Sequence, residues 1–490
     1  MNEIPSAPEL AKQAAKPAPA PEKILLYKAR ESIYPKAVHG RFRTVKWIVM
    51  AVTLGVYFGL PWLRLDRGPG LPDQAWLIDF AHQRLYLFGL EIWAQEFYYV
   101  TGILVLSALG LFLATALAGR VWCGYACPQT VWTDLTVLVE RLWQGDRSAR
   151  IRLAKAPWSF GKAFRLLGTR LTWLSIALLT GVTFVFYFRD APTIASELWH
   201  GNAHSLAYIA IGIVAFMTYM LGAVAREQMC IYMCPWPRIQ GAMFDADSLL
   251  VTYRGFRGEP RGAHRKGQSW DGRGDCIDCG QCIAACPTGI DIRNGPQLEC
   301  IACALCIDAC DEIMDKIGRP RKLIAYDSFR NLEAEAHGDR VPVRIVRPRT
   351  LLYTGVFTLV LAIMLFGLSH KAVLDLNVES GRDPLYVMVS GGGIRNGYKV
   401  HILNKQHETR QFKLQISGLS HPAFAFVSLE GSDPVIEVRP DEMREVKMYV
   451  TVPREEADTL PASTPVTFTV RDLGDGTEAK TNSNFRGPGK

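Results

Sequence analysis

The sequence predicts a multi-domain membrane protein with about five transmembrane α-helices, a ferredoxin-like cytoplasmic domain and a C-terminal immunoglobulin-like β-sandwich. Three observations support this fold class. Hydrophobic residues make up 49% of the 490 residues and are bunched into long runs. Eight of the 12 cysteines fall into two tandem runs in the second half of the chain. The last stretch, from about residue 373, alternates between apolar and polar residues as short strands do.

Five apolar runs are long enough to cross a bilayer, whose hydrocarbon core is about 30 Å thick. Aromatic residues at their ends, such as Trp62 and Tyr98, suit the membrane interfaces. None of the runs holds a pair of histidines, which argues against a bis-histidyl haem within the membrane. We place the helices near residues 45–63, 97–118, 171–188, 204–223 and 350–369.

The distribution of Lys and Arg predicts how these helices are oriented. Nine lie between the second and third helices and 18 within residues 224–349, against three between the first two helices and Arg189 alone between the third and fourth. Cytoplasmic loops are the ones enriched in positive charge. We therefore expect a multi-pass protein of the bacterial inner membrane, with the N-terminus and all 12 cysteines on the cytoplasmic side and the C-terminal domain in the periplasm. Thiols stay reduced in that compartment.

The domain boundaries follow from these patterns. Residues 1–40 are expected to be a disordered cytoplasmic tail, because they are rich in Ala, Pro and Lys and lack the apolar core of a signal peptide. The positive charges behind the formal net charge of +8 lie in particular loops, where they indicate the orientation of the chain in the membrane. We therefore expect membrane lipid as a partner, and not nucleic acid. The remaining domains are a membrane domain with four helices (41–250), a ferredoxin-type domain (251–345), the fifth transmembrane helix (346–372) and a periplasmic immunoglobulin-like domain (373–490).

The two tandem cysteine runs carry the strongest chemical signal. They read Cys276-x2-Cys279-x2-Cys282-x3-Cys286-Pro287 and Cys300-x2-Cys303-x2-Cys306-x3-Cys310. This spacing is the bacterial ferredoxin signature, in which the fourth cysteine of each run ligates the other cluster. We predict two [4Fe–4S] clusters, one on Cys276, Cys279, Cys282 and Cys310 and the other on Cys300, Cys303, Cys306 and Cys286.

Structural zinc is the alternative for these runs, because zinc also selects sets of four cysteines. Two complete four-cysteine runs in tandem are hard to explain in that way. Asp311 stands where a proline is expected after the second run, which leaves all four ligands in place.

A second signal is a repeated Cys-x3-Cys-Pro, at Cys123 to Pro128 and at Cys230 to Pro235. Spacing i, i+4 puts both sulfurs on one helical face, and the proline then breaks or kinks the helix. Each copy follows a predicted membrane helix, so Cys123, Cys127, Cys230 and Cys234 lie at one depth and could converge.

We treat these four thiols as a candidate catalytic and copper site. Met229 and Met233 flank the second pair, and a set of thiolates and thioethers suits Cu(I). Copper would be a substrate or a transient ligand there. The alternative is that the four cysteines are buried as small hydrophobic residues.

The residues resemble the FixG/RdxA/CcoG family of cytochrome oxidase accessory proteins, which are membrane-bound polyferredoxins. The resemblance covers nearly the whole chain, including the ferredoxin runs and the C-terminal sandwich. Among the stretches that carry it are Gly40-Arg41-Phe42-Arg43, Gly119-Arg120-Val121-Trp122-Cys123-Gly124-Tyr125-Ala126-Cys127-Pro128-Gln129, and Arg226-Glu227-Gln228 leading into Cys230-Ile231-Tyr232-Met233-Cys234-Pro235, and their combination is specific.

The resemblance implies an oxidoreductase that assists assembly of the cbb3-type haem–copper oxidase by reducing cupric ions and supplying Cu(I). Oxidase subunits and copper transporters or chaperones are the implied partners, and the electron donor is unknown. Two other functions stay open. One is a quinol-linked electron conduit like the membrane ferredoxin subunits of nitrate and nitrous oxide reductases, and the other is a non-catalytic copper chaperone.

Overall fold

The structure is a computed structural model, and its fold divides into two compact units, Met1–Ala362 and Ile363–Lys490. The described residues are 32–68, 71–265, 267–339, 341–381, 384–406, 408–419, 422–426, 435–440, 442–457 and 460–488. Most of the expected N-terminal tail, residues 1–31, lies outside them.

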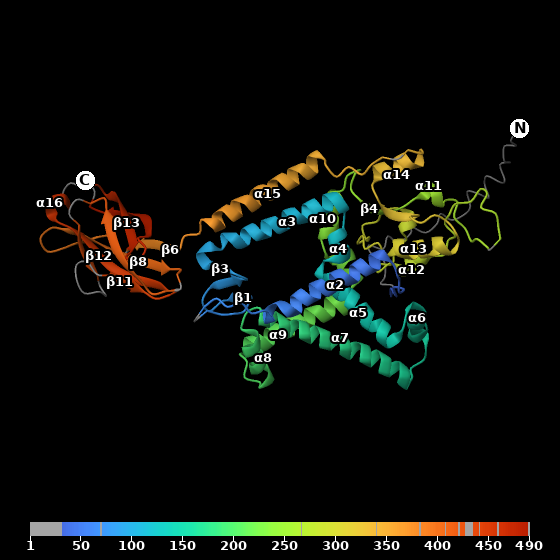
Figure 1. Ribbon diagram of the computed structural model, residues 1–490. Coiled ribbons are helices and arrows are strands. Elements are labelled where there is room, and N and C mark those ends of the chain that lie inside the picture. The colour runs from blue at the N-terminus through green and yellow to red at the C-terminus, as the bar shows by residue number, and fades with distance from the viewer. Residues whose placement is uncertain are drawn as a thin grey trace, which may run out of the picture. The chain divides into compact units, whose positions relative to one another are not determined.

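Five helices of the described chain are long and apolar enough to cross a membrane, as the sequence predicts (Figure 1). Four are in the first unit: α2 (Arg41–Gly59) with the turn η1 (Leu60–Trp62), α3 (Tyr98–Ala118), α7 (Phe160–Phe186), and α9 (Ser205–Thr218) continued by the π-helical η3 (Tyr219–Ala225). The fifth is α15 (Pro348–Ser369).

The third helix is longer than expected. The apolar run predicts it near 171–188, but α7 already begins at Phe160, where Ser159 caps it by accepting a hydrogen bond from the backbone N–H of Lys162 at 3.2 Å. The missed turns carry Lys162, Arg165 and Arg170, and a search for continuous apolar runs stops at such charges.

The remaining elements of the membrane domain gather at the two ends of these helices. At one end a three-stranded antiparallel sheet and α8 lie against the end of α7: the Gln74 side chain donates to the carbonyl of Phe186 at 2.7 Å and accepts from the N–H of Ala191 at 2.9 Å. At the other end are the short helices that carry the cysteine motifs. The bounds are β1 (Trp76–Asp79), β2 (Arg84–Leu87), β3 (Leu90–Trp93), η2 (Ala94–Glu96), α4 (Val121–Tyr125), α5 (Pro128–Gln144), α6 (Arg147–Lys155), α8 (Ala191–Trp199), η4 (Met229–Met233) and α10 (Trp236–Ala242).

The ferredoxin-like segment follows α10 and joins the end that carries the cysteine motifs. Its small core contains Val251, Ile292, Ile307 and Ile324, and strands β4 and β5 pair antiparallel across it. The bounds are β4 (Leu250–Tyr253), α11 (Gly255–Gly258), α12 (Gln281–Ala285), η5 (Ile292–Asn294), α13 (Leu305–Lys316), β5 (Ile324–Asp327) and α14 (Phe329–Ala336).

The second unit is a β-sandwich with antiparallel sheets in the order β10-β12-β8-β6, with β7 on β8, and β11-β9-β13-β14. The predicted alternation is confirmed, since Val400, Ile402, Phe412 and Phe468 are all buried between the sheets. The bounds are β6 (Leu374–Ser380), β7 (Val387–Met388), β8 (Ile394–Asn404), β9 (Arg410–Ser417), β10 (Ala423–Phe426), β11 (Val435–Val438), β12 (Met443–Val452), α16 (Arg454–Ala457), β13 (Ser463–Asp472) and β14 (Glu478–Arg486).

Candidate redox site

The two ferredoxin-type runs share the same backbone conformation at matched positions. Asp278 and Ala302 have φ of 54° and 55°, and the residues two further on, Gly280 and Ala304, have φ of 63° and 60°. The left-handed conformation is unfavourable for a residue with a side chain, and it persists where the surroundings require it. Both cysteine loops are therefore bent in the same way, and each bend leads into a helix, α12 or α13.

Each bent loop faces a cavity lined by cysteines of both runs. One cavity, with about 360 Å³ of space between atoms, is lined by Cys276, Cys279, Cys282 and Cys310. The other, with about 350 Å³, is lined by Cys286, Cys300, Cys303 and Cys306, and Cys282 reaches its wall as well. The last cysteine of each run thus lies with the first three of the other run, and the assignment of individual ligands stays a prediction.

The residues present fit iron–sulfur clusters at these cavities. The two cavities are of nearly equal size and are lined by four and five cysteines, and a [4Fe–4S] cluster requires four thiolates. Burial raises the pKa of Cys300 and of Cys310 to about 12, so these thiols keep their protons unless a cation replaces them. None of the described residues forms a group of three or more His, Cys, Asp or Glu side chains close enough to hold a single metal ion.

The two Cys-x3-Cys-Pro motifs also repeat each other in backbone conformation. Four residues before the first cysteine stand Gly119 (φ 57°, ψ −122°) and Arg226 (φ 48°, ψ −116°). The second cysteine is extended in each copy, and its N–H donates to a carbonyl five residues back, from Cys127 to Trp122 at 2.9 Å and from Cys234 to Met229 at 2.8 Å. The prediction that both cysteines of a motif lie on one face of a helix is therefore wrong, because the second cysteine is outside the helix. The prediction that the helix ends before each proline is confirmed.

Gln129 joins the two motifs. It follows Cys127 and Pro128, and its side-chain N–H group donates to the carbonyls of Leu221 and Arg226 at 2.7 and 3.1 Å, just ahead of the second motif. The Arg226 side chain also contacts Glu140 at 3.1 Å, so hydrogen bonds hold this residue in a conformation that favours glycine. In the sequence Gln129 and Arg226 stand out only as part of a resemblance, and no local pattern indicates a role for either.

The four thiols of the motifs are half-buried and lie within electrostatic range of one another. Burial raises the pKa of Cys123 to about 12, and the neighbouring Cys127, Cys230 and Cys234 thiols add to that rise. Burial likewise raises the pKa of Cys230 to about 11. Of the two candidate thioethers, Met229 is half-buried in η4 and Met233 is 62% exposed.

The first motif packs directly against the second ferredoxin-type run. Cys123 and Cys230 contact the buried cluster of Ile301, Cys303 and Leu305. Tyr125 donates its hydroxyl hydrogen to the carbonyl of Cys303 at 3.2 Å. A Cβ atom added to Gly124 would lie 2.8 Å from the carbonyl oxygen of Ile301, so only glycine permits this approach.

Arg120 links the second ferredoxin-type run to the second Cys-x3-Cys-Pro motif through hydrogen bonds. Its buried guanidinium donates to the carbonyl of Cys300 at 3.0 Å, and it also hydrogen-bonds to the carbonyls of Leu298 and Pro237. One side chain thus holds the end of α3, the second cysteine run and the segment after Cys234 together. Nothing in the local sequence pattern distinguished this arginine from the loop charges counted for orientation.

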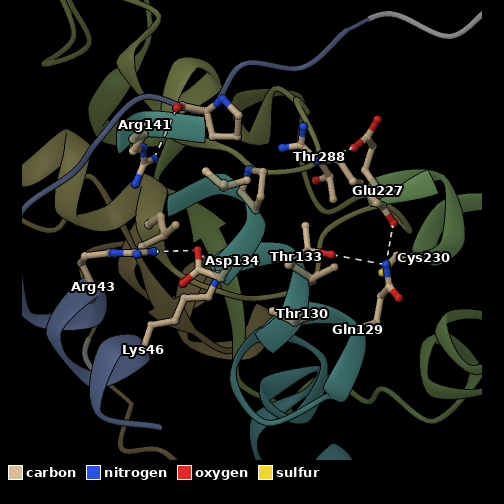
Figure 2. Close-up of a pocket in the computed structure, with 16 residues that line it drawn as sticks. Arg43, Lys46, Gln129, Thr130, Thr133, Asp134, Arg141, Glu227, Cys230 and Thr288 are labelled. Atoms are coloured by element: carbon tan, nitrogen blue, oxygen red, sulfur yellow. Dashed lines mark hydrogen bonds and ion pairs between the residues drawn. The ribbon is translucent and has the colours of Figure 1, made fainter. Parts of the chain in front are cut away.

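A further cavity lies beside Cys230 between α2, α5 and the cysteine loops, and the space between its atoms, open solvent included, is about 520 Å³. Figure 2 shows Arg43, Lys46 and Asp134 on one side of it, Gln129, Glu227 and Cys230 on the other, and Thr288 across from Thr133. Asp134 binds Arg43 at 2.9 Å and lies 3.6 Å from the Lys46 ammonium group. Although burial opposes it, the two cations hold the pKa of Asp134 below its usual range.

Three sequence families match parts of the chain. A 4Fe-4S binding domain matches residues 100–144, a 4Fe-4S dicluster domain matches residues 225–329, and the IG-like fold at the C-terminal of FixG matches residues 364–488. The first two matches include both Cys-x3-Cys-Pro motifs and both ferredoxin-type runs.

Curated proteins match over nearly the full length. Protein RdxB of Cereibacter sphaeroides is 47% identical over 470 residues, which cover 95% of this chain and 98% of that protein. The nitrogen fixation protein FixG of Rhizobium meliloti is 46% identical over 477 residues, covering 90% and 91%. Among solved structures, a FixG-related protein from Vibrio parahaemolyticus matches 24% of this chain and 98% of its own, with 19% identity and a TM-score of 0.21.

Proposed function

Because this chain belongs to the FixG/RdxA family of iron–sulfur electron-transfer proteins, we propose that it reduces Cu(II) to Cu(I) for assembly of a cbb3-type cytochrome oxidase. Two [4Fe–4S] clusters are the resident cofactors of this proposal, held by the two cysteine runs. When bound, such clusters supply single electrons, and the reduction of one cupric ion takes one electron.

The observation that carries the proposal is the contact of Cys123 and Cys230 with Ile301, Cys303 and Leu305. The thiols that would receive copper are packed against the cysteine run that would hold a cluster. Because these residues contact one another, the two redox sites would be neighbours.

The four thiols of the Cys-x3-Cys-Pro motifs are also suitable ligands for Cu(I), the product of the proposed reaction. Thiolates prefer Cu(I) to Cu(II), so a copper ion bound by Cys123, Cys127, Cys230 and Cys234 is easier to reduce than the ion in water. The high pKa of the Cys123 thiol means that binding releases protons.

Orientation and partners belong to the same proposal. The excess of Lys and Arg in the loops around the cysteines supports a cytoplasmic position for that end of the helices and a periplasmic position for the β-sandwich, in the inner membrane. Oxidase subunits, or copper transporters and chaperones, would then receive the product.

The test is the double variant Cys230→Ser and Cys234→Ser in the anaerobically purified protein. Iron and acid-labile sulfide should stay at the unsubstituted level, while reduction of added Cu(II), followed with a Cu(I)-specific chelator, should fall at least tenfold. Ala126→Ser is the matched control, because it adds the same hydroxyl inside the first motif and removes no thiol. Normal copper binding and reduction by the double variant would make these thiols structural.

A further inference from the structure

Another cavity lies between α5, α6, α7 and η3, at the end of the helices that carries the cysteine motifs. Its free volume is about 300 Å³. One water molecule needs only about 10–15 Å³ of such space, and sites for small molecules begin at about 300 Å³. The cavity therefore has room for a ligand and not only for a few ordered waters.

The wall of this cavity includes a buried arginine that does not use all of its N–H groups. Arg150, on α6, is only 2% exposed. Its Nη2 atom donates to the carboxylate of Glu140, but among the described residues its Nε and Nη1 atoms have no acceptor. Buried N–H groups without a partner are costly, and charged ones more so. We therefore expect the cavity to hold an acceptor for Arg150.

Cations outnumber carboxylates among the described residues of the wall. The cations are Arg150, Arg170 and Arg226, and the carboxylates are Glu140 and Glu227. Glu140 already pairs with Arg150 and, at 3.1 Å, with Arg226. Burial lowers the pKa of Arg150; Glu140 opposes this effect and the charge of Arg226 adds to it. An anion with several acceptor oxygens, such as a phosphate group, suits this wall, because guanidinium groups bind phosphate through charge-assisted hydrogen bonds.

The exposed part of the wall lies on two membrane-spanning helices, at Arg170 on α7 and at Val224 on η3. Counted back from Arg189 at 1.5 Å per residue, a hydrocarbon core about 30 Å thick takes about 20 residues and ends close to Arg170. The span of α9 and η3 ends at Ala225, so Val224 is also at the end of its helix. The mouth of the cavity is therefore at the level of lipid phosphate groups.

The surface of α7 beside Arg170 is apolar and exposed. Leu167, Leu171 and Leu174 are 58%, 53% and 45% exposed, in a helix long and apolar enough to cross a membrane. Exposed leucines on such a helix face lipid. Acyl chains can therefore lie along α7 while their headgroup enters the cavity.

We propose that this cavity binds the headgroup phosphate of an anionic phospholipid of the phosphatidylglycerol class. The phosphodiester oxygens accept hydrogen bonds from Arg150 and Arg170. A zwitterionic lipid fits less well, because its ammonium group would join a wall that already has an excess of cations. The bound lipid holds α6 and α7 together beside Arg226, which leads into the second Cys-x3-Cys-Pro motif.

Native mass spectrometry of the full-length protein tests the site. The protein is purified with its iron under anaerobic conditions, stripped of lipid in detergent and titrated with dioleoylphosphatidylglycerol. One molecule should bind at least tenfold more tightly than dioleoylphosphatidylethanolamine, and excess inorganic phosphate should not displace it. Displacement by phosphate would make this a site for free phosphate and overturn the lipid proposal. Equal affinity for the two lipids would also overturn it.

Two arginines of α7 give a matched pair of variants. Arg170 and Arg165 are both exposed, but only Arg170 is on the cavity wall. Arg170→Gln should weaken the binding of dioleoylphosphatidylglycerol about tenfold, and Arg165→Gln should leave it unchanged. Arg150→Lys keeps the charge and removes the Nε and Nη1 donors, so it should also weaken binding about tenfold. Equal affinities in Arg170→Gln and Arg165→Gln would contradict the site.

The melting temperature in detergent is the second readout. A ligand that binds only the folded protein stabilises it, so dioleoylphosphatidylglycerol should raise the melting temperature of the unsubstituted protein and of Arg165→Gln more than that of Arg170→Gln. The same shift in all three proteins would mean that the cavity holds water only. None of these measurements uses copper, so their failure would leave the proposed reductase function standing.

Discussion

Asp308, between two cysteines of the second ferredoxin-type run, caps the first membrane helix at Arg43. Its carboxylate accepts the backbone N–H of Arg43 at 2.7 Å and that of Phe42 at 3.2 Å. Gly40 occupies the N-cap position of α2 and has no side chain to do this, and a Cβ atom there would lie 2.4 Å from the Asp308 carboxyl carbon. A residue 265 positions away thus supplies the cap, and the carboxylate also complements the positive end of the helix dipole.

Removing this cap should destabilise the junction of the membrane and ferredoxin-like parts. Asp308→Ala leaves the buried N–H group of Arg43 and the partly buried N–H group of Phe42 without an acceptor, and we expect a loss of about 1–2 kcal/mol in the free energy of unfolding. The measurement is the melting temperature of the purified protein in detergent, with limited proteolysis as a second readout. Asp315→Ala, an exposed carboxylate on the same helix, is the control and should change little. Equal effects of the two variants would mean that the cap is energetically silent.

The contact between the first Cys-x3-Cys-Pro motif and the second run should depend on Gly124. Gly124→Ala places a methyl group 2.8 Å from the carbonyl oxygen of Ile301, which forces the two segments apart at a cost of about 1–3 kcal/mol. Copper reduction should fall several-fold while the iron content is retained. Gly161→Ala, where a Cβ atom meets nothing within 4 Å, is the control. If Gly124→Ala reduces copper at the normal rate, electron transfer does not need this close approach.

Cys286 should matter to the cluster of the other run. The structure places it on the cavity wall with Cys300, Cys303 and Cys306, so Cys286→Ala should remove about half of the roughly eight irons expected for two clusters. Electron paramagnetic resonance after dithionite reduction should show one of two signals lost. Cys279→Ala, from the other cavity, should remove the other signal. Loss of the same signal in both variants would show that the ligand pairing is wrong.

Orientation can be tested with reporters. Alkaline phosphatase fused behind residue 488 should be active, because we expect the β-sandwich to be periplasmic, and green fluorescent protein at that point should be dark. The same two reporters inserted near residue 260 should give the opposite result. A reversed pattern would contradict the count of Lys and Arg in the loops.

Much of the fold could be read from local pattern. Length and hydropathy are enough to find a membrane helix, and a period of two is enough to find the strands around Val400 and Phe468. The early start of α7 was missed because Lys162 and Arg165 interrupt the apolar run. The two cysteine runs can also be recognised from local pattern, because the loop around a cluster fixes the spacing of the cluster's ligands.

The sequence by itself thus determined the elements whose signature is periodic or closely spaced: the apolar helices, the strands and the two sets of cysteines. Only the tertiary structure decided which distant segments meet. It brought Asp308 to Arg43, Gly124 to Ile301, and Asp134 into a cavity beside Cys230. A single buried carboxylate or glycine has no local pattern, because its role depends on helices that pack together across hundreds of residues. That packing is a property of the whole chain.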